Sequence, residues 1–162
     1  MTSSHRSTAA PRHETTYETP SECELIITRT FNAPRAVVWA AFTDPKHLPN
    51  WQPSNATMPV CEIDLRPGGR WRYVYRNGQG RELGVSGTYR DVEPPRRYVQ
   101  VIDHNGEESI TETEFTEHDG RTTVRVSNRY ASIASRDQAL KYAKFGAGSS
   151  YERLDGYLTT HF

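Results

Sequence analysis

The chain has 162 residues, and its 20 Lys and Arg balance its 20 Asp and Glu, so the formal net charge is zero. This length suffices for one domain with its own core, and the zero net charge gives no electrostatic reason to expect a nucleic-acid partner. No stretch approaches the roughly 18 uninterrupted apolar residues of a spanning helix, and the N-terminus lacks the apolar core of a secretory signal, so we expect a cytoplasmic protein without membrane insertion.

Residues 1–22 predict a disordered tail. Serine and threonine dominate this segment, which has almost no large apolar side chains, so it cannot bury enough surface to offset the entropy lost on ordering. The domain is therefore predicted to span residues 23–162.

The domain opens with a strand followed by two short helices. Residues 23–31 are rich in β-branched side chains, which favour a strand. Asn32 can cap the following helix, and Pro34 suits its first turn. A second short helix is predicted from Leu48 to Trp51, after the break at Asp44-Pro45.

Six further strands are predicted from the period-two alternation of the next segment. In residues 70–76, Trp71, Tyr73 and Tyr75 alternate with arginines, as in a half-buried antiparallel strand. Turn residues separate the strands, among them Asp119-Gly120, which indicates a hairpin. The predicted strands cover residues 60–65, 70–76, 85–93, 98–102, 108–116 and 122–130.

A long helix is predicted from about Ser135 to the end of the chain. Ser135 can cap it, with Gln138 completing a capping box. One stripe of this helix carries Ala143, Ala147, Ser150, Tyr151, Leu154 and Leu158. The pattern predicts an α+β fold in which a curved antiparallel sheet of about seven strands wraps this helix.

The inward face of the predicted sheet is aromatic but also carries hydroxyl and amide groups. It faces a helix section of small residues, from Gly146 to Ser150. Two interpretations remain open: large and small side chains interlock, or they leave a cavity for a small ligand. The predicted ligand-binding residues are Trp51, Trp71, Tyr73, Tyr75, Val85, Tyr89, Thr113, Phe115, Val126, Asn128, Tyr130, Ala143, Ala147, Ser150, Tyr151 and Leu154.

Arg29 is predicted to point inward, because it is two positions from Ile27 and four from Leu25 and therefore shares their face of the first strand. A buried arginine needs an acidic partner or an anionic ligand. Glu152 or Asp155 of the long helix could be that partner, and a ligand contact is the alternative.

Motifs for catalysis and metal binding are missing from the sequence. There is no nucleophile elbow, phosphate-binding loop or dinucleotide fingerprint, and the six histidines lack metal-ligand spacing. Cys23 and Cys61 are interpreted as small buried hydrophobes. We therefore predict no catalytic residues, no metal and no cofactor.

Several segments together resemble the START-like (SRPBCC) superfamily and, within it, the branch named after the activator of the heat-shock chaperone ATPase. The resemblance extends over roughly residues 24–160. The segments that carry it are ELIITRTFNAP at 24–34, VWAAFTDP at 38–45, CEIDLRPGGRW at 61–71, GTY at 87–89, EPPRR at 93–97 and RLDGYL at 153–158.

The resemblance implies the helix-grip fold, a seven-stranded sheet curled around a C-terminal helix with a cavity between them. Members of the superfamily bind lipids, hormones or polyketide-like molecules, and some are cyclases or hydrolases. Relatives often carry a bulky aromatic side chain where this chain has Ala147, which by size alone would enlarge the cavity.

Three hypotheses follow for function. The first is binding of a small hydrophobic or aromatic molecule in the cavity, without catalysis. The second is a cyclase-like or hydrolase-like enzyme that uses the same cavity and donates hydrogen bonds from Tyr73, Tyr75, Asn128 or Tyr130. The third, implied by the branch name alone, is an interaction module that activates a chaperone ATPase, with the chaperone as its partner.

Overall fold

The computed structural model describes residues 14–53, 56–104 and 106–162, except for the side chains of His104 and of residues 145–149. Its elements are, in chain order, β1 (Thr16–Glu18), β2 (Glu24–Phe31), α1 (Arg35–Thr43), the 3-10 helix η1 (Leu48–Asn50), β3 (Ala56–Ile63), β4 (Arg70–Asn77), β5 (Glu82–Glu93), β6 (Arg97–His104), β7 (Glu107–His118), β8 (Arg121–Arg129) and α2 (Ile133–His161).

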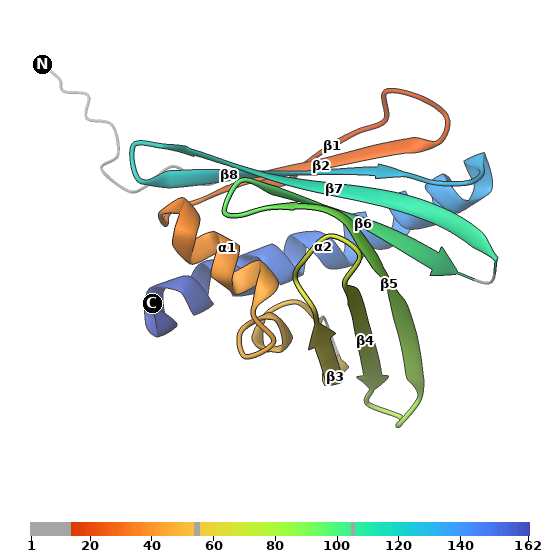
Figure 1. Ribbon diagram of the computed structural model, residues 1–162, viewed down its shortest axis with the longest axis horizontal. Helices are drawn as coiled ribbons and strands as arrows, with labels where there is room; N and C mark the ends of the chain where they lie inside the picture. The colour runs from red at the N-terminus through yellow and green to blue at the C-terminus, as the bar shows by residue number, and fades with distance from the viewer. Residues whose placement is uncertain (1–13, 54–55, 105) are drawn as a thin grey trace, which may run out of the picture.

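The strands form one antiparallel sheet of eight strands in the order β1-β2-β8-β7-β6-β5-β4-β3. The chain reaches the far edge of the sheet from β2 through α1 and η1, and it then meanders back through hairpins to β8. Figure 1 shows α2 lying along the inner face of the curved sheet, with α1 near its C-terminal end. The predicted α+β helix-grip architecture is confirmed, with eight strands in place of about seven.

The additional strand is β1, which lies inside the segment predicted to be a disordered tail. That prediction is wrong for Thr16–Glu18, which pair with Glu24–Phe31 across the sheet edge. Three residues are too few to show an alternation pattern. Tertiary contacts hold them instead, since the Tyr17 hydroxyl donates to the carbonyl of Ala143 on α2 at 3.1 Å. Residues 1–13 lie outside the described residues.

Both helix starts differ by a few residues from the prediction. The N-cap of α1 is Pro34, without a side-chain capping bond, so Asn32 is not the cap. The N-cap of α2 is Ser132, whose hydroxyl accepts from the backbone N–H of Ser135 at 3.1 Å. Ser132 has the extended backbone that a cap requires, whereas Ser135 already lies within the helix.

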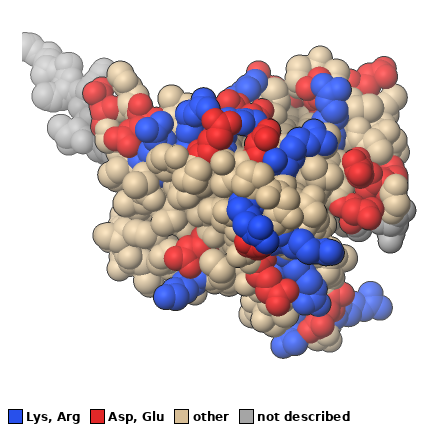
Figure 2. Space-filling view, viewed as in Figure 1, with Lys and Arg blue, Asp and Glu red and all other residues tan. Residues whose placement is uncertain are grey.

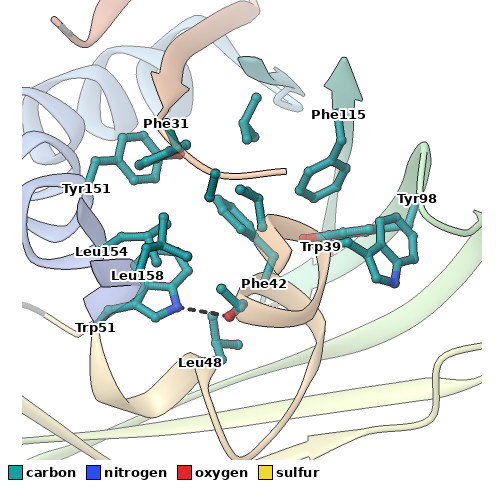
Figure 3. Close-up of a cluster of buried hydrophobic side chains, with 14 of the residues drawn as sticks. Phe31, Trp39, Phe42, Leu48, Trp51, Tyr98, Phe115, Tyr151, Leu154 and Leu158 are labelled. Carbon is teal, nitrogen blue, oxygen red and sulfur yellow. Dashed lines mark hydrogen bonds between the residues drawn. The ribbon is translucent and has the colours of Figure 1, made fainter. Parts of the chain in front are cut away.

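The core fills the space between the inner face of the sheet, α1 and the C-terminal half of α2. Phe42 of α1 packs between Phe115 of β7 and Trp51, with ring centroids 5.3 and 4.8 Å away (Figure 3). The indole N–H of Trp51 donates to the carbonyl of Ala41 at 2.9 Å, so the polar end of this buried aromatic side chain is satisfied.

Arg29 points inward as predicted and is only 6% exposed. Its guanidinium pairs with Asp155 of α2 and donates to the Thr15 hydroxyl at 3.0 Å. It also lies 5.7 Å from the ring centroid of Phe31. Of the two acids predicted as partners, Asp155 is therefore the one that pairs with Arg29.

None of the described helices is both long enough and apolar enough to cross a membrane.

Candidate functional site

A cavity of about 190 Å³ lies between the inner face of the sheet, η1 and α2. Strands β4, β6, β7 and β8 form one side of it. The other side comes from α1, η1, the residues after η1, and α2, which converge on this part of the sheet (Figure 1). Each of the two interpretations therefore applies to part of this space. Aromatic side chains fill the space around Phe42, and the cavity remains beside them.

Part of the predicted ligand-binding set meets at this cavity. The residues come from three strands, from α2 and from the segment after η1, and they combine aromatic rings with hydroxyl groups. The predicted residues that line the cavity are Trp51, Tyr73, Thr113, Val126, Ser150 and Tyr151.

The other predicted residues do not line this cavity. Trp71, Tyr89, Phe115 and Leu154 are buried in the core, because neighbouring side chains pack over them. Those that are partly buried without lining the cavity are Tyr75, Val85, Asn128 and Ala143. Tyr130 lines a separate hollow. The side chain of Ala147 lies outside the described residues.

Six further lining residues were missed: Phe42, Leu48, Gln52, Tyr98, Gln100 and Thr111. Tyr98 and Gln100 face the cavity because they pair in register with Thr113 and Thr111. The period-two rule could have found them once the hairpin register was fixed. Gln100 was obscured because its two direct neighbours, Val99 and Val101, are apolar and lie on the opposite face of the strand.

Hydrogen bonds hold the polar side chains of the lining in place. The Gln100 amide donates to the Tyr73 hydroxyl at 3.3 Å, and the Thr111 hydroxyl donates to Asn128 Oδ1 at 2.9 Å. On the helix side, the Ser150 hydroxyl donates to the backbone carbonyl of Gln52 at 2.6 Å. Because both partners of each bond are fixed in the fold, these groups are preorganised.

Gln52 is the exception among the polar side chains of the lining. Its side chain hydrogen-bonds Tyr75, but its Oε1 atom is buried without a hydrogen-bond partner among the described residues. A buried acceptor without a partner costs about 1–3 kcal/mol. A donor on a bound molecule, or a water, would relieve that cost.

The phenols of the lining stay protonated over the ordinary pH range. Burial raises the pKa of Tyr98 to about 12, partly offset by a hydrogen bond from Thr113. Burial also raises the pKa of Tyr73 well above its ordinary value, and it raises the pKa of Tyr151. The described part of the lining contains no Asp, Glu, Lys, Arg or His, so it suits an uncharged molecule.

Neither cysteine forms a disulfide, and both are partly buried. Burial and the charge of Asp44 raise the pKa of the Cys61 thiol to about 11, so this thiol is not activated as a nucleophile. Among the described residues, no group of three or more His, Cys, Asp and Glu side chains is placed to hold a metal ion.

The sequence matches the model of the family described as Activator of Hsp90 ATPase homolog 1-like protein over residues 32–159. Among solved structures, a Rhodobacter sphaeroides protein is 26% identical with a TM-score of 0.85, covering 92% of this chain and 100% of its own. A Mycobacterium smegmatis protein is 28% identical with a TM-score of 0.76, covering 92% of this chain and 98% of its own.

An AHSA1-like protein from Aeromonas hydrophila is 21% identical with a TM-score of 0.70, and the match covers 85% of this chain and 96% of that one. At this identity the likeness concerns the fold alone. The comparison with curated proteins gives no match.

Proposed function

Since the chain belongs to the Activator of Hsp90 ATPase homolog 1-like family of the START-like superfamily, we propose that it binds a small uncharged aromatic molecule in the cavity between the sheet and α2. The observation that carries this proposal is the cavity of about 190 Å³, with aromatic walls, hydroxyl and amide groups, and no charged side chain among the described residues that line it.

The cavity volume limits the size of the ligand. An engineered apolar cavity of about 150 Å³ admits benzene, whereas pockets for drug-sized ligands are about 300–1,000 Å³. A cavity of about 190 Å³ lies between these cases. A molecule with one ring, or a compact pair of fused rings, is therefore the expected occupant.

The polar groups of the lining favour a ligand that carries a hydrogen-bond donor. Gln52 Oε1 is the acceptor without a partner, and a phenolic O–H or an indole N–H is the matching donor. The aromatic side chains of Trp51, Phe42 and Tyr151, which all line the cavity, lie close together (Figure 3). They would pack against the ring edge to face or offset.

Burying a ring with about 150 Å² of apolar surface contributes about 4 kcal/mol to the binding free energy. This corresponds to a dissociation constant near 1 mM. One hydrogen bond adds about 1 kcal/mol. We therefore expect such probes to bind at high micromolar to millimolar concentrations.

The test uses Val126→Phe, which places a larger side chain in the cavity, and Val101→Phe as the matched control on the opposite face of the sheet. The probes are phenol, indole and the charged analogue benzoate, and binding is followed by protein NMR shifts. The parent and the control should bind phenol or indole. Val126→Phe should bind these neutral probes at least about tenfold more weakly. Benzoate should bind poorly to all three proteins.

If the parent bound neither neutral probe, or if folded Val126→Phe bound them as well as the parent, the cavity would not be the binding site. Benzoate binding as tightly as phenol would overturn the proposed preference for an uncharged ligand.

A further inference from the structure

A second hollow, of about 320 Å³, opens at the N-terminal end of α2. Its floor and walls come from the β6–β7 hairpin, the residues that follow β8 and the first turns of α2. Among the described residues, none lines both this hollow and the smaller cavity. We propose that this hollow binds a hydrophobic organic cation, an aromatic ring carried on a short chain with an ammonium group.

The walls of the hollow are mostly apolar and include two tyrosines. Ile102, Tyr130 and Ala139 are partly buried within it. Tyr142 stands at its edge and is 71% exposed, although it is a large aromatic side chain on a helix. A volume of about 320 Å³ lies in the range of ligand pockets, so an aromatic group with a short chain can enter.

Glu107 and Glu108, at the start of β7, are among the residues that line the same hollow. Both are exposed, and within the described part of the chain neither forms an ion pair. Six other glutamates of the sheet pair with arginines, whereas Glu18 and Glu117 form no ion pair within the described residues. The paired ones are Glu24, Glu62, Glu82, Glu93, Glu112 and Glu114.

A third carboxylate adds to this negative charge. Asp103 lies directly across the hairpin from Glu108, and like charges opposite each other destabilise a strand pair. In Figure 2, acidic side chains gather at the right edge of the molecule, where Figure 1 shows the β6–β7 hairpin. A cation bound here would reduce this repulsion.

Together, the tyrosine rings and the two glutamates, which form no ion pair within the described residues, determine the ligand class. An ammonium group is attracted both by carboxylates and by the faces of aromatic rings, and the apolar walls accommodate the rest of the molecule. A neutral aromatic molecule would gain only the apolar part of this interaction. An anion would be repelled by Glu107 and Glu108.

The test compares 2-phenylethylammonium with its uncharged analogue 2-phenylethanol, using the full chain and NMR titration. Attraction of the ammonium group to the glutamates and the tyrosine rings should make this compound bind about tenfold more tightly than the alcohol at low salt. Because exposed charges are screened, this preference should shrink as salt is raised. Shifts should centre on Tyr130, Ala139 and Tyr142.

The double variant Glu107→Gln/Glu108→Gln should lose that preference, with both probes binding alike. The control Glu18→Gln/Glu152→Gln changes the net charge equally, away from the hollow, and should retain the preference. Tyr142→Ala should weaken the binding of both probes about threefold or more. This variant tests the contribution of the aromatic wall without altering the charge.

Equal binding of the two probes to the parent, or an unchanged preference in the Glu107→Gln/Glu108→Gln protein, would overturn the proposal. Val126→Phe separates the two sites, since it should leave binding of 2-phenylethylammonium unchanged. Loss of that binding in Val126→Phe would place the cation in the smaller cavity and overturn the assignment to the hollow.

Discussion

The guanidinium of Arg29 on β2 pairs with the carboxylate of Asp155 on α2, two residues 126 positions apart in the chain. Arg29 is 6% exposed and Asp155 40% exposed, so a buried cation meets a half-exposed anion. This pair connects the first long strand of the sheet to the C-terminal helix across the core.

Asp155→Asn should lower the free energy of unfolding by about 2 kcal/mol, because the Arg29 cation stays buried and loses its charged hydrogen-bond partner. Urea unfolding followed by circular dichroism measures this change. Glu152→Gln, an exposed charge change on the same helix, should stay within about 0.5 kcal/mol of the parent. Equal stability of Asp155→Asn and the parent would show that the pair contributes nothing.

Strand β1 should contribute measurably to stability although it has only three residues. A chain that starts at residue 14 retains β1, whereas one that starts at residue 19 lacks the pairing with β2, the Thr15–Arg29 bond and the Tyr17–Ala143 bond. The free energy of unfolding of the shorter chain should be at least about 1 kcal/mol lower than that of the longer one. Identical urea midpoints for the two chains would mean that β1 is energetically neutral.

Two glycines of β5 should respond in opposite ways to the same substitution. A Cβ on Gly87 would collide with the backbone carbonyl oxygen of Val101 on β6, whereas a Cβ on Gly84 meets nothing within 4 Å. Gly87→Ala should therefore destabilise the protein by about 3 kcal/mol or more. Gly84→Ala should be neutral or slightly stabilising, because alanine restricts the unfolded chain.

Thermal unfolding of the two alanine variants checks this difference. A Gly87→Ala protein as stable as the Gly84→Ala protein would contradict the close approach of β5 and β6 at this position.

Alkaline pH should destabilise the fold through its buried phenols. Burial raises the pKa of Tyr98 from the ordinary value of 10.0 to about 12. Below pH 10 the phenol is protonated in both states. Above it, the unfolded chain releases the proton first, so the free energy of unfolding falls as pH rises toward about 12. A single group contributes at most about 1.4 kcal/mol per pH unit.

Urea unfolding at a series of alkaline pH values, together with tyrosinate absorbance, measures this slope. Tyr98→Phe removes one such group, so its stability should fall less steeply with pH than that of the parent. Parallel slopes for the two proteins would mean that Tyr98 titrates alike in both states.

The sequence by itself determined the antiparallel sheet apart from β1, the helices, and the inward side of β2, β4, β5, β7 and β8. Period-two alternation placed Tyr73, Thr113 and Val126 on the inner face, and it placed Arg29 there as well, which the structure confirms. Alternation succeeds because a strand has only two faces and burial favours one of them. The family resemblance, confirmed by the match over residues 32–159, supplied the arrangement of one sheet curled around the C-terminal helix.

Only the tertiary structure decided which inward residues border an empty space. Trp71 and Tyr73 share one face of β4, yet Trp71 is buried in the core and Tyr73 lines the cavity. Alternation gives the face of a residue but not what stands opposite it, which depends on α1 and α2. The same limit applies to β1 and to Asp155 as the partner of Arg29, because residues far apart in the chain form these contacts.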